Sequence, residues 1–211
     1  MSEKDEILRQ ITEIKHHLVD KESFFPYNYN ACHVWSLIAI VLTFVMIPSY
    51  ESSVIFGTVV TTLLMAIGFI VEGILTKKVN ESYDIDECTS RQAFVVKSFI
   101  MISLFAITFS AILAMMKLYL LIFLLWLFLI SLGYFSVGFV LNIKAYERVA
   151  IFNTLSSVVL LSYGAYFNLL DSRGVFLSIV QGVVILGLAV LPALIALQQQ
   201  RAEKANRTCS V

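Results

Sequence analysis

One apolar stretch, Val54–Thr76, constrains the fold of this chain more than any other feature of its sequence. As a helix with a rise of about 1.5 Å per residue, it is long enough to cross a hydrocarbon core of about 30 Å. Other runs resemble it, and the six predicted membrane spans are residues 31–48, 54–76, 94–116, 119–141, 150–170 and 175–197. Because lipid offers no hydrogen-bond partner to the backbone, each run is predicted to be a helix. The predicted fold class is therefore an all-α membrane protein with six transmembrane helices.

The composition agrees with a membrane protein and excludes other classes. Hydrophobic residues make up 59% of the 211-residue chain and charged residues 14%, which is too apolar for an ordinary soluble domain. The formal charge is zero, and the few basic residues lie at the ends of the spans, so we expect no nucleic-acid partner. The polar N-terminus has no signal-peptide pattern, so the first span is expected to direct the chain into the cell (inner) membrane.

Basic residues decide the expected orientation. Thirteen Lys and Arg residues fall on the side of the two termini, whereas only Lys117 and Arg173 fall on the other side. By the positive-inside rule, both termini are expected in the cytoplasm. The connections on the outer side are short, at residues 49–53, 117–118 and 171–174. Short connections favour antiparallel neighbours, so the spans are expected to form three hairpins.

The chain is expected to divide into three parts. Residues 1–30 form a cytoplasmic amphipathic helix and a segment that leads into the membrane, residues 31–197 form the transmembrane domain, and residues 198–211 form a polar cytoplasmic tail. The apolar side chains of the first helix share one face. These side chains are Ile7, Ile11, Ile14 and Leu18. Such a face favours self-association or a partner helix, and packing against the protein's own cytoplasmic surface is the alternative.

The second span carries its small and polar residues on one stripe. Their spacings of three and four residues place them on one helical face. These residues are Thr58, Thr61, Met65, Gly68 and Glu72. Small and polar residues in a transmembrane helix favour contact with other helices, so this face is expected to point into the bundle. The fourth span is apolar all round, with Trp126 in its middle, and is expected to face lipid or another subunit over much of its circumference.

Glu72 is an acid within a membrane span, which requires a partner or a function. Lys97 lies at a similar depth in the third span, so one hypothesis is a structural ion pair between them. The alternative is a protonatable or cation-binding site. Asn153 and Gln181 are polar residues on the fifth and sixth spans, and they suggest a polar cavity among spans two, five and six that the stripe of the second span would also line.

No catalytic, cofactor-binding or metal-binding residue is predicted. The cysteines Cys32, Cys88 and Cys209 lack CxxC spacing, and no spacing brings the histidines to them as metal ligands. The sequence contains no HExxH, no GxSxG and no phosphate-binding glycine loop, so common enzyme classes lack their usual residues. A TVGYG filter and an arginine ladder are also missing, which disfavours potassium channels and voltage sensors.

The sequence therefore favours a non-enzymatic polytopic membrane protein that self-associates or serves as an accessory subunit of a membrane complex. Its expected partners are the lipid bilayer and either further copies of the chain or another membrane protein, and no cofactor is expected. A small transporter or channel with a polar cavity is the alternative. A lipid-modifying membrane enzyme is a second alternative, which the scarcity of acid–base groups disfavours.

Overall fold

A computed structural model describes residues 6–7, 9–11, 28–82, 90–141, 143–170 and 174–208. Within these ranges the regular elements are all helical, and six spans are long and apolar enough to cross a membrane. The helices are α2 (Tyr29–Ser52), α3 (Val54–Ser82), α4 (Ser90–Met115), α5 (Tyr119–Leu141), α6 (Lys144–Tyr166), α7 (Val175–Ile185), the π-helical turn η1 (Leu186–Val190) and α8 (Leu191–Thr208). The structure therefore confirms the all-α prediction for the described residues, and the six long apolar helices agree with a multi-pass membrane protein.

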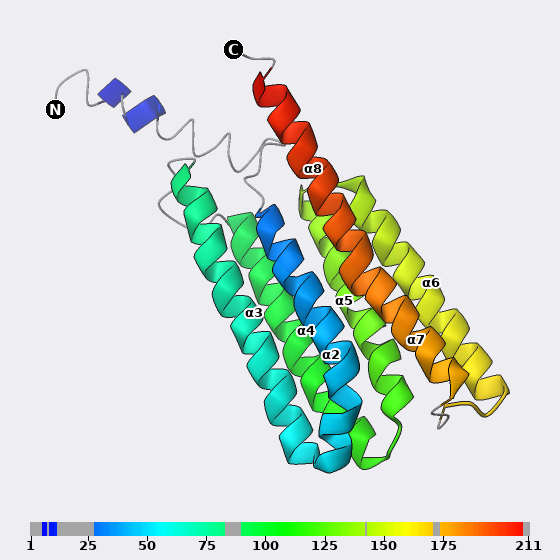
Figure 1. Cartoon of the computed structure of the whole chain (residues 1–211). Coiled ribbons are helices and arrows are strands. Elements are labelled where there is room, and N and C mark those ends of the chain that lie inside the picture. The colour runs from blue at the N-terminus through cyan, green and yellow to red at the C-terminus, as the bar shows by residue number, and fades with distance from the viewer. Residues whose placement is uncertain are drawn as a thin grey trace.

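The spans run side by side as one bundle (Figure 1). α7, η1 and α8 follow one another without a break and form the sixth span. α2 begins and α8 ends at the same end of the bundle, which we call the terminal end (Figure 1). α2 joins α3, and α4 joins α5, at the opposite end, which we call the loop end. α3 and α4 lie to one side of α2, and α6 lies to the other (Figure 1).

α5 lies in the middle of the bundle, so the expectation that this span faces lipid or another subunit over much of its circumference is wrong. Half of its membrane-spanning window is buried, against 22% for α3. Trp126 is 5% exposed, and Phe123 and Leu127 are almost fully buried. α5 packs most closely against α6 and then against α4. Hydropathy does not reveal this position because an apolar helix is equally compatible with lipid and with protein neighbours.

The helices extend beyond several predicted boundaries. α2 continues through Pro48 to Ser52, as transmembrane helices do where surrounding groups compensate for the missing backbone donor. α6 begins at Lys144, six residues before the predicted span, and ends at Tyr166. α8 continues to Thr208, so most of the expected polar tail is helical. A hydropathy window does not detect polar residues at the end of a helix, which explains the extensions of α6 and α8.

The packing of the spans gives α2 and α5 most of the interior contacts. α2 packs most extensively against α3, whereas α6 makes few contacts with the sixth span. The fifth and sixth spans, which were expected to form a hairpin, therefore pack only weakly against each other. On α3, the predicted stripe faces the interior, because Thr61 and Met65 are 0% and 5% exposed. This face brings Glu72 toward α2.

Candidate functional site

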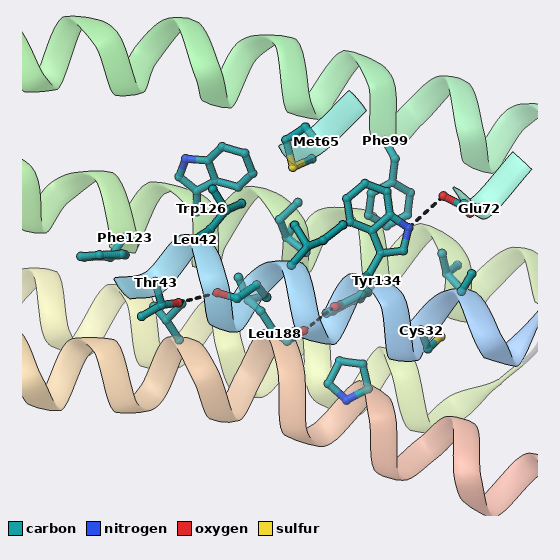
Figure 2. A pocket seen from close by; sticks show the side chains of 18 of the residues that line it. Cys32, Leu42, Thr43, Met65, Glu72, Phe99, Phe123, Trp126, Tyr134 and Leu188 are labelled. Carbon is teal, nitrogen blue, oxygen red and sulfur yellow. Dashed lines mark hydrogen bonds between the residues drawn. The ribbon is translucent and has the colours of Figure 1, made fainter. Parts of the chain in front are cut away.

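A cavity lies inside the bundle, among α2, α3, α4, α5 and the sixth span. Its volume is ≈ 110 Å³, several times the ~10–15 Å³ that one water molecule needs. It follows α2 from Ala31 to Met46, a rise of about 22 Å at 1.5 Å per residue. The cavity is therefore long and narrow, and Figure 2 shows its lining side chains spread along the helices.

One face of α2 lines the cavity over its whole length. The residues recur every three or four positions, as one side of an α-helix requires. On α2 they are Ala31, Cys32, Trp35, Ile38, Ala39, Leu42, Thr43 and Met46. The other lining residues are Met65 and Glu72 of α3, Val95 and Phe99 of α4, Phe123, Trp126, Ile130, Tyr134 and Val137 of α5, and Val184, Leu188 and Pro192 of the sixth span. The lining is mostly apolar and aromatic, which is typical of small-molecule sites.

Glu72 and Trp35 form a polar contact toward the terminal end of the cavity. The indole Nε1–H of Trp35 donates a hydrogen bond of 2.9 Å to Glu72 Oε2 (Figure 2). Among the described lining residues, Glu72 is the only carboxylate, and none is a Lys, Arg or His. The cavity therefore holds an acid that a neutral donor orients and that no basic residue of the described lining balances.

The position of Trp35 depends on a glycine of α3. A Cβ on Gly68 would lie 2.7 Å from two atoms of the Trp35 ring, which is closer than real Cβ atoms approach. Phe69 contacts the same indole edge to face, with ring centroids 5.0 Å apart. Gly68 thus makes room for the indole beside α3, and the indole in turn reaches Glu72, one turn further along that helix.

The second tryptophan lies toward the loop end of the cavity, beside Phe123 and Leu42 (Figure 2). Trp126 Nε1–H donates a hydrogen bond of 2.8 Å to Ser110 Oγ of α4, so its polar atom is satisfied away from lipid. The chain has two tryptophans, and both line the cavity. A tryptophan signal from this protein therefore comes entirely from residues that line the cavity.

The π-helical turn η1 binds side chains from three other helices. Asn153 Nδ2 of α6 donates to Gly187 O at 3.1 Å, Tyr134 OH of α5 donates to Leu188 O at 3.2 Å, and Ser36 Oγ of α2 donates to Ala189 O at 2.8 Å. A π-helical turn disturbs the regular α-helical hydrogen-bond ladder and often occurs at functional sites. Here its three successive carbonyls hold α2, α5 and α6 against the sixth span beside the cavity.

Most of the predicted site residues make contacts other than those expected from the sequence. Glu72 does line the cavity. Lys97 is exposed, and within the described residues it forms no ion pair with Glu72, because α3 packs mainly against α2, whose Trp35 supplies the partner. Thr58 and Thr61 donate to carbonyls of their own helix, each at 2.8 Å, which leaves their hydroxyls directed along α3.

The cavity does not lie among spans two, five and six as expected, since α6 supplies none of its described lining residues. Asn153 is fully buried and bonded to η1, and Gln181 Nε2 donates to Thr43 O of α2 at 3.2 Å. Both amides therefore join helices. The sequence interpretation missed Trp35, Phe99 and Tyr134, whose aromatic character on separate spans gives no periodic signal.

Neither a search for metal-binding groups nor a comparison with known proteins assigns a function to the site. The described residues contain no group of three His, Cys, Asp or Glu that could hold a metal ion, and His16, His17 and Cys88 lie outside them. Comparison with known protein families, curated proteins and solved structures finds no match for the chain. The assignment of function therefore rests on the site itself.

Proposed function

We propose that this protein is a non-enzymatic membrane protein of the transporter type, which binds a small amphipathic molecule in the cavity between its helices. The observation that carries this proposal is the long cavity at the centre of the bundle, with Glu72 as its single described carboxylate. Small-molecule sites are concave and mostly apolar, with few oriented polar groups. Sites of secondary transporters lie between helices within the membrane, and the bundle supplies such a place.

The packing around the cavity supports binding over a purely structural role. Five of the six spans line it, so a bound molecule would contact every span except α6. Movements of the helices relative to one another would therefore be coupled to occupancy of the cavity. A structural void would not require a carboxylate oriented by an indole donor, because an uncompensated acid in a membrane is costly.

Mass spectrometry of the purified protein tests this function without knowledge of the ligand. Ala39 lines the middle of the cavity, so Ala39→Phe fills it. Ala66 is exposed on α3, so Ala66→Phe adds the same ring on the outside. We expect native spectra to show a co-purifying small molecule on the wild type and on Ala66→Phe, and none on Ala39→Phe. Identical spectra for the two variants would refute the proposal.

Self-association through the N-terminal helix is a second candidate function. Ile7 and Ile11 are 50% and 55% exposed, so the bundle does not cover this part of the apolar face, whereas Ile14 and Leu18 lie outside the described residues. The double variant Ile11→Asp, Ile14→Asp should reduce the assembled species in native detergent mass analysis. Gln10→Asp, which adds charge at an exposed position beside the apolar face, is the control, and an unchanged mass of the double variant counts against this function.

We further propose that the protein lies in the cell (inner) membrane with both termini in the cytoplasm, with an amphipathic helix before the first span. Thirteen basic residues on the side of the termini support this orientation. The terminal end of the bundle, where α2 begins and α8 ends (Figure 1), would then face the cytoplasm. Glu72 would lie in the cytoplasmic half of the membrane.

A further inference from the structure

The charge of the cavity restricts the class of ligand. Trp35 donates one neutral hydrogen bond to Glu72, and the described lining contains no Lys, Arg or His. A carboxylate in a poorly solvated site is stabilised by an opposite charge and destabilised by a like charge. An anionic ligand would place a second negative charge beside Glu72, and with a neutral ligand the carboxyl group would have to take up a proton or remain an unbalanced charge. A ligand with one positive charge satisfies this end of the cavity best.

The aromatic side chains favour an organic cation over a metal ion. Five of the lining residues are aromatic: Trp35, Phe99, Phe123, Trp126 and Tyr134. Phe99 and Tyr134, with ring centroids 6.4 Å apart, lie near the Glu72 end in Figure 2. The faces of aromatic rings attract alkylammonium ions, and tryptophan does so most strongly. A hard metal cation would instead require several oxygen ligands, which the described lining does not offer together.

The shape of the cavity completes the description of the ligand. From Glu72 and Cys32 it continues along α2 to Leu42, Trp126 and Phe123 (Figure 2). This further part is apolar except for Thr43, whose hydroxyl donates to Ala39 O of its own helix. We infer that the cavity binds a single-chain organic ammonium ion, with its charged head against Glu72 and Trp35 and its apolar chain directed along α2 toward Trp126. The inference rests on the proposed function and names the ligand class of the same site.

Tryptophan fluorescence gives a direct test, because both tryptophans line the cavity. The protein in dodecyl-maltoside micelles, whose headgroups are uncharged, is titrated with three probes of equal chain length that carry a bromine quencher at the chain end. The probes are ω-bromodecyltrimethylammonium, ω-bromodecanol and ω-bromodecanoate. We expect saturable quenching by the ammonium probe at a concentration about tenfold lower than by the other two, which corresponds to about 1.4 kcal/mol.

Variants at Glu72 separate charge from packing. Glu72→Gln retains an oxygen that can accept from Trp35 but removes the charge, so the preference for the ammonium probe should disappear. Glu72→Asp keeps the charge and should keep a preference. Ala39→Phe should abolish saturable quenching by all three probes, and Ala66→Phe should leave it as in the wild type. If Glu72→Gln does not fold, the affinities of the wild type and of Glu72→Asp for the three probes decide whether the cavity prefers the ammonium ion.

The outcomes distinguish this inference from the proposed function. Equal affinities for the three probes, all lost in Ala39→Phe, would overturn the ammonium assignment and leave the binding function intact. Quenching that Ala39→Phe does not change would overturn the binding function itself. Lysophosphatidylcholine as a competitor identifies the source of the ammonium group: displacement of the probe assigns a choline lipid, and no displacement assigns a free alkylammonium ion.

Discussion

Trp35 has two roles at the terminal end of the cavity. Its Nε1–H holds the carboxylate of Glu72 at 2.9 Å, and its ring occupies the space that the missing side chain of Gly68 leaves. The sequence identified Glu72, because any acid in a membrane span requires explanation. It did not identify Trp35. The sequence predicts which residues lie at the same depth in the membrane, but not which faces of two helices contact each other. Lys97 was level with Glu72, yet it is exposed on α4.

A double-mutant cycle measures the contact between these two residues. Trp35→Phe removes the donor and Glu72→Leu removes the acceptor, and the double variant completes the cycle. We expect a coupling energy of about 0.6 to 1.7 kcal/mol, the range for hydrogen bonds between transmembrane helices. Unfolding of the four proteins in mixed micelles, followed by circular dichroism, gives the free energies. A coupling energy of zero within error would mean that this hydrogen bond contributes nothing to stability.

Gly68→Ala tests the close approach of α2 and α3. The added Cβ would meet the Trp35 ring at 2.7 Å, so the indole must shift, and overpacking of this kind costs about 1–3 kcal/mol. Gly73 on the same helix has no atom of the described residues within 4 Å of an added Cβ, so Gly73→Ala is the matched control and should be neutral or slightly stabilising. Thermal unfolding in micelles compares them. Equal midpoints for the two variants would show that the indole is not confined.

At the scale of elements, hydropathy predicted that six helices exist but not which of them form the interior. The apolar α5 lies at the centre, whereas the more polar α6 supplies none of the described lining of the cavity. The buried Asn153 of α6 is instead bonded to Gly187 O of the sixth span. The turn η1 was not predicted from the sequence, since an irregular helical turn within an apolar segment does not change the hydropathy. Its carbonyls accept hydrogen bonds from other helices, and these helices become neighbours only in the folded bundle.

Gly187→Ala tests the attachment of η1 to α6. An added Cβ on Gly187 would overlap Asn153 Oδ1, which is buried and has no hydrogen-bond partner among the described residues. The amide would have to turn away, and the bond from Asn153 Nδ2 to Gly187 O would be lost. We expect a destabilisation of about 1–3 kcal/mol, read from unfolding in micelles. Gly182→Ala is the control, because no atom in the described part of the chain lies within 4 Å of the added Cβ. Its stability should match or exceed that of the wild type, and a loss similar to that of Gly187→Ala would contradict the predicted effect.

At the scale of the whole molecule, the orientation in the membrane decides from which side the acid of the cavity is reached. The basic residues gather on the side of the two termini, and the terminal end of the bundle brings the start of α2 and the end of α8 together (Figure 1). Under the positive-inside rule that end is expected to face the cytoplasm. A ligand would then meet Glu72 from the cytoplasmic half of the bilayer and extend its chain toward the outer half.

Single-cysteine labelling in intact cells tests this orientation. The three native cysteines are changed to serine, and a new cysteine is placed either at Met116, exposed at the loop end, or at Gln198, exposed near the terminal end. A membrane-impermeant maleimide should label Met116→Cys in intact cells and Gln198→Cys only after lysis, because the bilayer separates the two sites. The reverse pattern would invert the topology and place Glu72 in the outer half. The ammonium ligand would then have to approach the cavity from outside the cell.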